Sequence, residues 1–192
     1  MVLYVNCCVR KESRTDRLAR ALLEDLGEYT ELYLPSEGIR PLTEEMLIKR
    51  TSLLESGQFD DPMFRYAKQF AEADKIVISA PFWDGSFPSL LKIYIENIYV
   101  VGIVSRYGDA GVPVGLCKAD ELIYVTTAGG PYIPDFSFGY IKALAETCFG
   151  IKKTKLIKSE MLDIVGVDAE KILSAAINSI SETEVYPKIQ GA

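Results

Sequence analysis

Ile123-Tyr124-Val125-Thr126-Thr127-Ala128-Gly129-Gly130-Pro131-Tyr132 is a run of β-forming residues that ends in two adjacent glycines. The run predicts a buried strand at residues 121–127, and the glycines predict backbone without side-chain bulk at its carboxyl end, which leaves room for a ligand against the main chain. In open α/β sheets, ligands bind at the carboxyl ends of the strands. We therefore expect Thr127, Ala128, Gly129 and Gly130 to form one wall of a pocket for a planar ligand. The alternative is that the two glycines mark only a turn.

Strands and helices alternate on both sides of this stretch. Apolar runs predict further strands at residues 2–7, 29–34, 75–80 and 153–161. Periodicity and capping residues predict helices at residues 16–26, 43–55, 62–73, 89–100, 139–149 and 169–181. Strands that alternate with helices form parallel sheets covered on both faces. We predict one flavodoxin-like, doubly wound α/β domain over residues 1–192, with a five-stranded parallel sheet and its longest irregular segment at residues 102–115.

Composition and charge exclude several classes of protein. The chain has 192 residues, of which 48% are hydrophobic and 25% charged, as is usual for soluble globular proteins. Its formal net charge of -6 argues against nucleic-acid binding and against attachment to anionic membranes. The longest apolar stretch, residues 93–104, is too short and too polar to span a bilayer. Because a strand begins at Val2, no room is left for a signal peptide, and we expect a cytoplasmic protein.

The cysteines and the lack of histidine also restrict the chemistry. The chain contains no histidine, and its cysteines are Cys7, Cys8, Cys117 and Cys148. No Cys-x-x-Cys pair is present, so we expect no zinc site and reduced, mostly buried thiols. The absence of histidine removes the usual catalytic triads and the commonest general base.

The segment from Cys7 to Thr15 leads from the first strand into the first helix and has the features of a phosphate site. Ser13 and Thr15 supply hydroxyl groups, and a helix N-terminus favours an anion. The basic residues of this segment are Arg10, Lys11 and Arg14. No Walker A motif and no G-x-G-x-x-G is present, so we predict a site for a single phosphate. The alternative is that Ser13 or Thr15 only caps the helix.

The loop after the third strand is rich in aromatic residues. It begins Pro81-Phe82-Trp83-Asp84 and continues with Gly85-Ser86-Phe87-Pro88. Aromatic side chains at the carboxyl end of a strand can stack on a flat ring or contact its edge. The alternative, for one or two of the three aromatic residues, is a hydrophobic plug between sheet and helix. The only tryptophan of the chain lies in this loop, which favours the pocket.

Two further segments carry weaker signals. Residues 90–101 are apolar on more than one face, which predicts either a deeply buried helix or a helix that contacts a second subunit. We favour the second subunit, and hence a homodimer. Lysines 152, 153, 155 and 158 are expected to lie on a solvated strand edge, and no partner follows from them.

Taken together, these motifs resemble the FMN-dependent NAD(P)H azoreductases and quinone reductases of the flavodoxin-like superfamily. The resemblance covers roughly residues 1–160 and rests on order and spacing. The motifs are Ser13-Arg14-Thr15, Pro81-Phe82-Trp83-Asp84, Leu91-Lys92-Ile93-Tyr94-Ile95-Glu96, Gly102 with Arg106-Tyr107, Pro113-Val114-Gly115-Leu116 and Thr127-Ala128-Gly129-Gly130.

The resemblance implies one FMN per subunit at the carboxyl ends of the strands, in a homodimer with active sites at its interface. Its phosphate would bind Ser13, Arg14 and Thr15 near Cys8, and its ring would lie between residues 81–84 and residues 127–130. Tyr107 and Tyr132 would contact a small aromatic substrate. NADH or NADPH would donate a hydride to the flavin, and a quinone, azo or nitro compound would then accept two electrons, in a ping-pong order. No side chain is assigned as the catalyst.

The chain departs from the family pattern in three places, one of which is that no further serine follows Thr15 in the loop up to Asp16. Asp84 stands where asparagine is common, and either its carboxylate disfavours an anionic reduced flavin or only its backbone is used. Cys8 stands where a small hydroxyl residue often helps to hold the phosphate, and a thiol is a weaker donor. Two other functions also fit the fold. These are a flavodoxin-type electron carrier without enzymatic activity, and a flavin-free binding protein.

Overall fold

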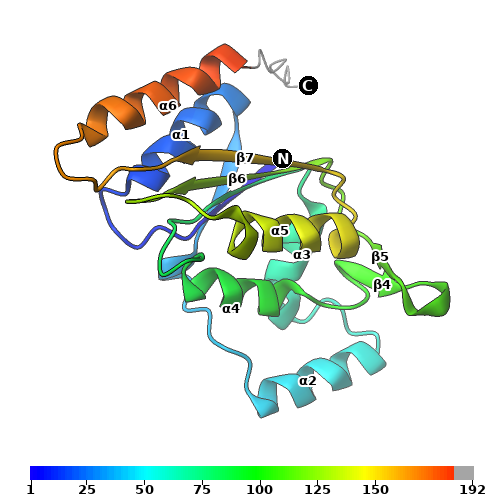
Figure 1. The fold of residues 1–192 in the computed structure, drawn as a ribbon. Helices are drawn as coiled ribbons and strands as arrows, with labels where there is room; N and C mark the ends of the chain where they lie inside the picture. Colours follow the sequence, from blue (N-terminus) through cyan, green and yellow to red (C-terminus); the bar gives the residue numbers. More distant parts are fainter. Residues whose placement is uncertain (184–192) are drawn as a thin grey trace.

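The computed structural model describes residues 1–183. Its main sheet has five parallel strands in the order β2-β1-β3-β6-β7. Their bounds are Val2–Asn6 (β1), Tyr29–Tyr33 (β2), Lys75–Ser79 (β3), Glu121–Thr127 (β6) and Lys153–Ser159 (β7). The predicted doubly wound fold is confirmed, because strand order reverses between β1 and β3 and helices cover both faces (Figure 1).

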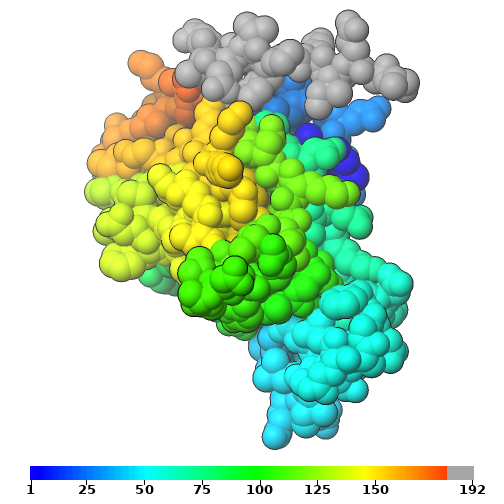
Figure 2. Space-filling model, turned by 90° about the vertical axis from the view of Figure 1, so that its right-hand side faces the viewer, coloured from blue at the N-terminus to red at the C-terminus, as the bar shows by residue number. Residues whose placement is uncertain are grey.

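The helices form two layers and one separate arm (Figure 1). One face of the sheet carries α1 (Arg14–Leu26) and α6 (Ala169–Thr183), and the other carries α3 (Arg65–Glu72), α4 (Ser89–Ile98) and α5 (Phe138–Leu144). Helix α2 (Glu44–Glu55) lies away from the sheet, in the cyan projection of Figure 2. Short 3-10 turns lie at Leu34–Ser36, Pro62–Phe64, Asp109–Gly111 and Pro134–Phe136. In the described part of the chain, no helix is long and apolar enough to cross a membrane.

A hydrophobic core lies on each face of the sheet, and the alternation of side chains along the strands explains which residues belong to each. Side chains alternate across a strand, so Leu3 and Val5 pack with α3, α4 and α5, whereas Val2 and Tyr4 pack with α1 and α6. All five residues of β1 are buried, as expected for a central strand of a covered parallel sheet.

All six predicted helices differ from the observed ones by a few residues at one end or both, and two of these differences have a clear backbone cause. The apolar helix α4 stops at Ile98, because the backbone leaves the helical region at Tyr99 (ψ 80°). The helix predicted for residues 139–149 is α5 followed by one π-helical turn, Ala145–Phe149, which ends at Gly150 with φ 81°. Gly115 packs directly on the backbone at Gly150, and a Cβ atom on Gly115 would collide with that backbone.

The prediction that residues 102–115 are irregular is wrong. They contain a two-stranded antiparallel hairpin of β4 (Ser105–Tyr107) and β5 (Pro113–Gly115). Its tip turns through Ala110 and Gly111, both with positive φ, which allows the two short strands to pair. The backbone returns from the hairpin into β6, and Lys118 donates a hydrogen bond to the carbonyl of Ala71 (2.8 Å). The hairpin therefore lies at the amino end of the sheet.

Candidate functional site: a pocket at the carboxyl ends of the strands

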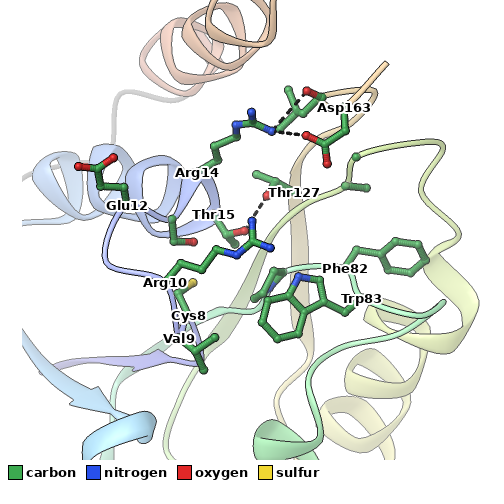
Figure 3. A pocket seen from close by; sticks show the side chains of 15 residues that line it. Cys8, Val9, Arg10, Glu12, Arg14, Thr15, Phe82, Trp83, Thr127 and Asp163 are labelled. Carbon is green, nitrogen blue, oxygen red and sulfur yellow. Dashed lines mark hydrogen bonds and ion pairs between the residues drawn. The ribbon is translucent and has the colours of Figure 1, made fainter. Parts of the chain in front are cut away.

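A cavity of about 370 Å³ lies where β1, β3 and β6 end (Figure 3). The loops after these three strands all contribute to its wall, as predicted, and the segment after β7 closes a fourth side. The lining residues are Cys8, Val9, Arg10, Glu12, Ser13, Arg14, Thr15, Pro81, Phe82, Trp83, Thr127, Ala128, Gly129, Leu162 and Asp163. Of the predicted cofactor-binding residues, only Asp84 and Gly130 are not among them.

The N-terminus of α1 forms one end of the cavity. Ser13 is the N-cap of α1, and its hydroxyl oxygen accepts a hydrogen bond from the Asp16 N–H (3.3 Å). The next two N–H groups, of Arg14 and Thr15, have no partner within the helix because of their position. The capping role considered for Ser13 and the anion-binding role thus coexist, since the cap uses a different donor from those available to a ligand.

The side chains of Arg14 and Thr15 are both held by other parts of the wall. Arg14 Nη1 lies 2.7 Å from Asp163 Oδ1 and donates to the carbonyl of Leu162 (3.3 Å). The hydroxyls of Thr15 and Thr127 are 2.6 Å apart and buried. Figure 3 shows that these contacts join the start of α1 to the segment after β7 and to the end of β6. The first helix and the strand-ending loops are therefore tied together around the cavity.

The aromatic loop makes a tight turn beside the cavity. Trp83 N–H donates to the Ser86 carbonyl (2.8 Å) and Ser86 N–H donates to the Trp83 carbonyl (2.9 Å). Between them, Asp84 and Gly85 have φ values of 50° and 83°, as a type I′ turn requires. Asparagine and aspartate are the non-glycine residues that tolerate this conformation best. Asp84 is exposed and outside the cavity wall, so the turn itself accounts for a short polar residue here.

Position 129 needs a glycine because of a neighbouring side chain, and not because of its own backbone angles. The segment after β7 pairs with residues 128–130, and Asp163 N–H donates to the Gly129 carbonyl (2.9 Å). A Cβ atom on Gly129 would overlap the Asp163 carboxylate and lie 3.0 Å from its Cγ, whereas one on Gly130 meets nothing within 4 Å. The expectation that the missing side chain makes room for the ligand is corrected here, since the space is taken by Asp163.

The two predicted substrate-binding tyrosines lie in different places. Tyr132 is 8% exposed, and its ring packs edge-to-face on Phe82 with centroids 4.9 Å apart. Its hydroxyl lies 2.8 Å from the Ser137 hydroxyl, and burial raises its pKa. It therefore supports the cavity wall from behind. Tyr107 is 65% exposed on the β4–β5 hairpin, at the opposite end of the sheet, so within one subunit it does not reach the cavity.

Sequence reasoning missed the segment after β7. Leu162 and Asp163 line the cavity, and Glu160 accepts the Tyr132 N–H (2.9 Å) while it pairs with Lys158 (2.6 Å). The pKa of Glu160 is lowered, mainly by the hydrogen bond that Lys158 donates to it. The rule about carboxyl ends, applied to the fifth predicted strand, would have found this segment.

Comparison with known proteins agrees with this geometry. A family described as having the flavodoxin-like fold matches residues 1–183. The chain belongs to the flavodoxin-like family. It is 37% identical to a protein of Clostridium acetobutylicum named FMN-dependent NADH:quinone oxidoreductase 2, over 94% of this chain and 96% of the relative. It is 34% identical to a protein of Coprothermobacter proteolyticus named FMN-dependent NADH:quinone oxidoreductase, with the same coverage of both chains.

Solved structures share the fold at lower identity. An azoreductase from Bacillus anthracis superposes with a TM-score of 0.80 at 24% identity, covering 94% of this chain and 96% of that one. A second structure from the same species, titled an FMN-dependent NADH-azoreductase in complex with FMN, gives a TM-score of 0.78 at 20% identity, over 94% and 95% of the two chains. At these identities the likeness establishes the flavodoxin-like fold.

A buried polar network supports the cavity floor of this flavodoxin-like protein. Tyr4 donates to Asp16 Oδ1 (2.7 Å), and its hydroxyl lies 2.8 Å from the Ser79 hydroxyl. Asn6 Oδ1 accepts the Cys8 N–H (2.9 Å), and Cys8 Sγ lies 3.6 Å from Ser79 Oγ. Burial raises the pKa of Tyr4 and of Cys8, so both stay protonated and neutral. The network fixes the backbone of the β1–α1 loop without placing a charge from Cys8 in the cavity.

Substitution of Tyr4 by phenylalanine is expected to lower the free energy of unfolding by about 1–3 kcal/mol, because it removes a hydrogen bond to a carboxylate and one to a hydroxyl. Urea unfolding measures the change. Tyr94→Phe is the matched control, since the Tyr94 hydroxyl is buried and has no hydrogen-bond partner among residues 1–183. The control should be neutral or stabilising, and equal losses in the two variants would contradict the proposed role of the network.

Proposed function

We propose that this protein is an FMN-dependent oxidoreductase that transfers two electrons from NADH to a quinone or a similar small aromatic acceptor. The observation that carries the proposal is one cavity in which a helix N-terminus and two arginines lie opposite Phe82 and Trp83. The curated relatives matched over nearly their whole length are named FMN-dependent NADH:quinone oxidoreductases. Residues 1–192 would act as one domain that binds one FMN.

The donor set of the cavity fits a flavin mononucleotide. Its anion-binding end offers the N–H groups of Arg14 and Thr15 and the hydroxyl of Ser13, which suits one phosphate. Trp83 supplies an aromatic face, and the pairing of residues 128–130 with residues 161–163 makes a firm opposite wall. The N–H groups of Gly129 and Gly130 donate no hydrogen bond within residues 1–183, so the Gly129 N–H at the cavity wall is available to a polar ring edge.

When bound, FMN supplies the redox chemistry, accepting a hydride from a nicotinamide and passing two electrons to the acceptor. The residues of this chain supply position and shape. Trp83, 37% exposed, borders the open side of the cavity, and Phe82 is braced by Tyr132. Because donor and acceptor would both have to reach the same bound flavin, they would bind in turn, in a ping-pong order. No side chain of the wall is assigned a proton-transfer role.

We also propose that two copies of the chain form a homodimer in the cytoplasm, and that each copy's hairpin completes the other's cavity. The hairpin extends from the rest of the chain at the right of Figure 1 and exposes Tyr107 and Val112, at 65% and 61%. On α4, Leu90 and Ile93 remain only partly buried in the single subunit. Burial of such apolar side chains favours association.

Replacement of Tyr107 by alanine tests this arrangement. It is expected to raise KM for a quinone severalfold while the affinity for FMN stays within about twofold, because Tyr107 would contact the substrate rather than the cofactor. Steady-state kinetics and flavin titration measure the two quantities. Unchanged kinetics, or a wild-type protein that is monomeric by ultracentrifugation at assay concentration, would contradict the assignment.

The main experiment is titration of the purified protein with FMN, followed by mixing with NADH and 1,4-benzoquinone. Trp83 is the only tryptophan and lines the cavity, so bound flavin is expected to quench its fluorescence. NADH oxidation that depends on FMN and the quinone supports the oxidoreductase. Bound FMN without direct NADH oxidation would favour an electron carrier, and absence of FMN binding would favour a flavin-free binding protein.

A further inference from the structure

The two arginines of the cavity wall have different surroundings. Arg14 is engaged by the Asp163 carboxylate (2.7 Å) and the Leu162 carbonyl (3.3 Å). Arg10 makes no ion pair and no hydrogen bond with any residue of the described chain, 1–183, and Figure 3 shows its guanidinium directed into the cavity. We infer that Arg10 is the cation that selects a phosphorylated flavin, and that Arg14 instead neutralises Asp163. This inference rests on the proposed function.

The pairing of Arg14 follows from the position of Asp163. This carboxylate belongs to the cavity wall, and its side chain is 69% exposed. If Arg14 turned toward a bound phosphate, Asp163 would be left as an uncompensated negative charge near a second negative group. Like charges repel each other, so an intact ion pair between Arg14 and Asp163 favours phosphate binding more than a free Asp163 would. Arg14 and Asp163 together then contribute no net charge to the cavity.

Arg10 supplies the net positive charge that remains. The other acidic residue of the wall, Glu12, points away from the cavity toward the helices in Figure 3. A guanidinium group can form two parallel hydrogen bonds with a phosphate, which lysine cannot do. In a chain of net charge -6, an unpaired arginine in the loop that leads into α1 provides local attraction for an anion that the rest of the surface would repel.

The test compares FMN with riboflavin, which has the same ring system and no phosphate. The measured quantity is the ratio of the Kd for riboflavin to the Kd for FMN, obtained from quenching of Trp83 fluorescence. In Arg10→Ala this ratio is expected to fall roughly 10- to 100-fold, as loss of a charge-assisted contact predicts, while the Kd for riboflavin stays within about twofold. Arg10→Lys should give an intermediate ratio.

The matched control is the double variant Arg14→Ala/Asp163→Ala, which removes a whole ion pair and leaves the net charge unchanged. Its ratio is expected to stay within about threefold of the wild type, even if both flavins bind less tightly. Circular dichroism and thermal unfolding establish that each variant is folded. An unchanged ratio in Arg10→Ala, or an equal fall in the control, would overturn the inference while FMN binding by the wild type stands. A wild-type protein that binds neither flavin would overturn the proposed function as well.

Discussion

Replacement of Gly129 by valine is expected to weaken FMN binding by at least about 100-fold while the sheet stays folded. The new side chain would collide with Asp163, whose carboxylate occupies the space that a Cβ atom needs. Asp163 would have to leave, which breaks its ion pair with Arg14 and its hydrogen bond to the Gly129 carbonyl. Overpacking of this kind costs about 1–3 kcal/mol and would displace the cavity wall. Flavin titration and urea unfolding measure the two effects.

Two controls locate the collision. Gly130→Ala should bind FMN within about twofold of the wild type, since a Cβ atom there meets nothing within 4 Å. The double variant Gly129→Val/Asp163→Gly removes the atoms that collide and should recover most of the lost affinity. If the second change restores nothing, the valine side chain must act on the ligand directly, and the explanation through Asp163 is wrong.

Replacement of Ser13 by glutamate is expected to reduce FMN affinity by about 100-fold or more. The substitution places a carboxylate at the N-cap of α1, where the phosphate is proposed to bind, so two negative groups would compete for the same N–H groups. Riboflavin carries no phosphate, and its affinity should change much less. Fluorescence titration with both flavins provides the measurement.

Ser13→Gly is the control for the loss of the cap. Glycine at an N-cap costs only a few tenths of a kcal/mol relative to serine, and it adds no charge. We expect FMN affinity within about tenfold of the wild type. If the glycine and glutamate variants lose FMN to the same extent, the loss comes from the cap rather than from charge. Full FMN affinity in Ser13→Glu would mean that the phosphate lies elsewhere.

The sequence was sufficient to predict the fold and most of the cavity. The strand at Glu121–Thr127 has the predicted bounds, and the strands before and after it differ only at their ends. Parallel strands end at one edge of a sheet, so the loops after β1, β3 and β6 had to meet once the alternation of strands and helices was recognised. Local patterns also predicted the Ser13 capping and the aromatic loop, because these depend on residues close in sequence.

The tertiary structure decided what each of these residues does. Gly129 must be glycine because a segment more than thirty residues later lies against it, and Arg14 is paired rather than free because the same segment brings Asp163 within 2.7 Å. Tyr107 lies at the opposite end of the sheet, because α4 returns the chain to the amino ends of the strands before the hairpin begins. Periodicity and turn propensity report on neighbours along the chain, whereas side-chain partners and free charges depend on contacts between distant segments. The sequence by itself therefore determined where the pocket forms, and only the folded chain determined that Arg10 faces it.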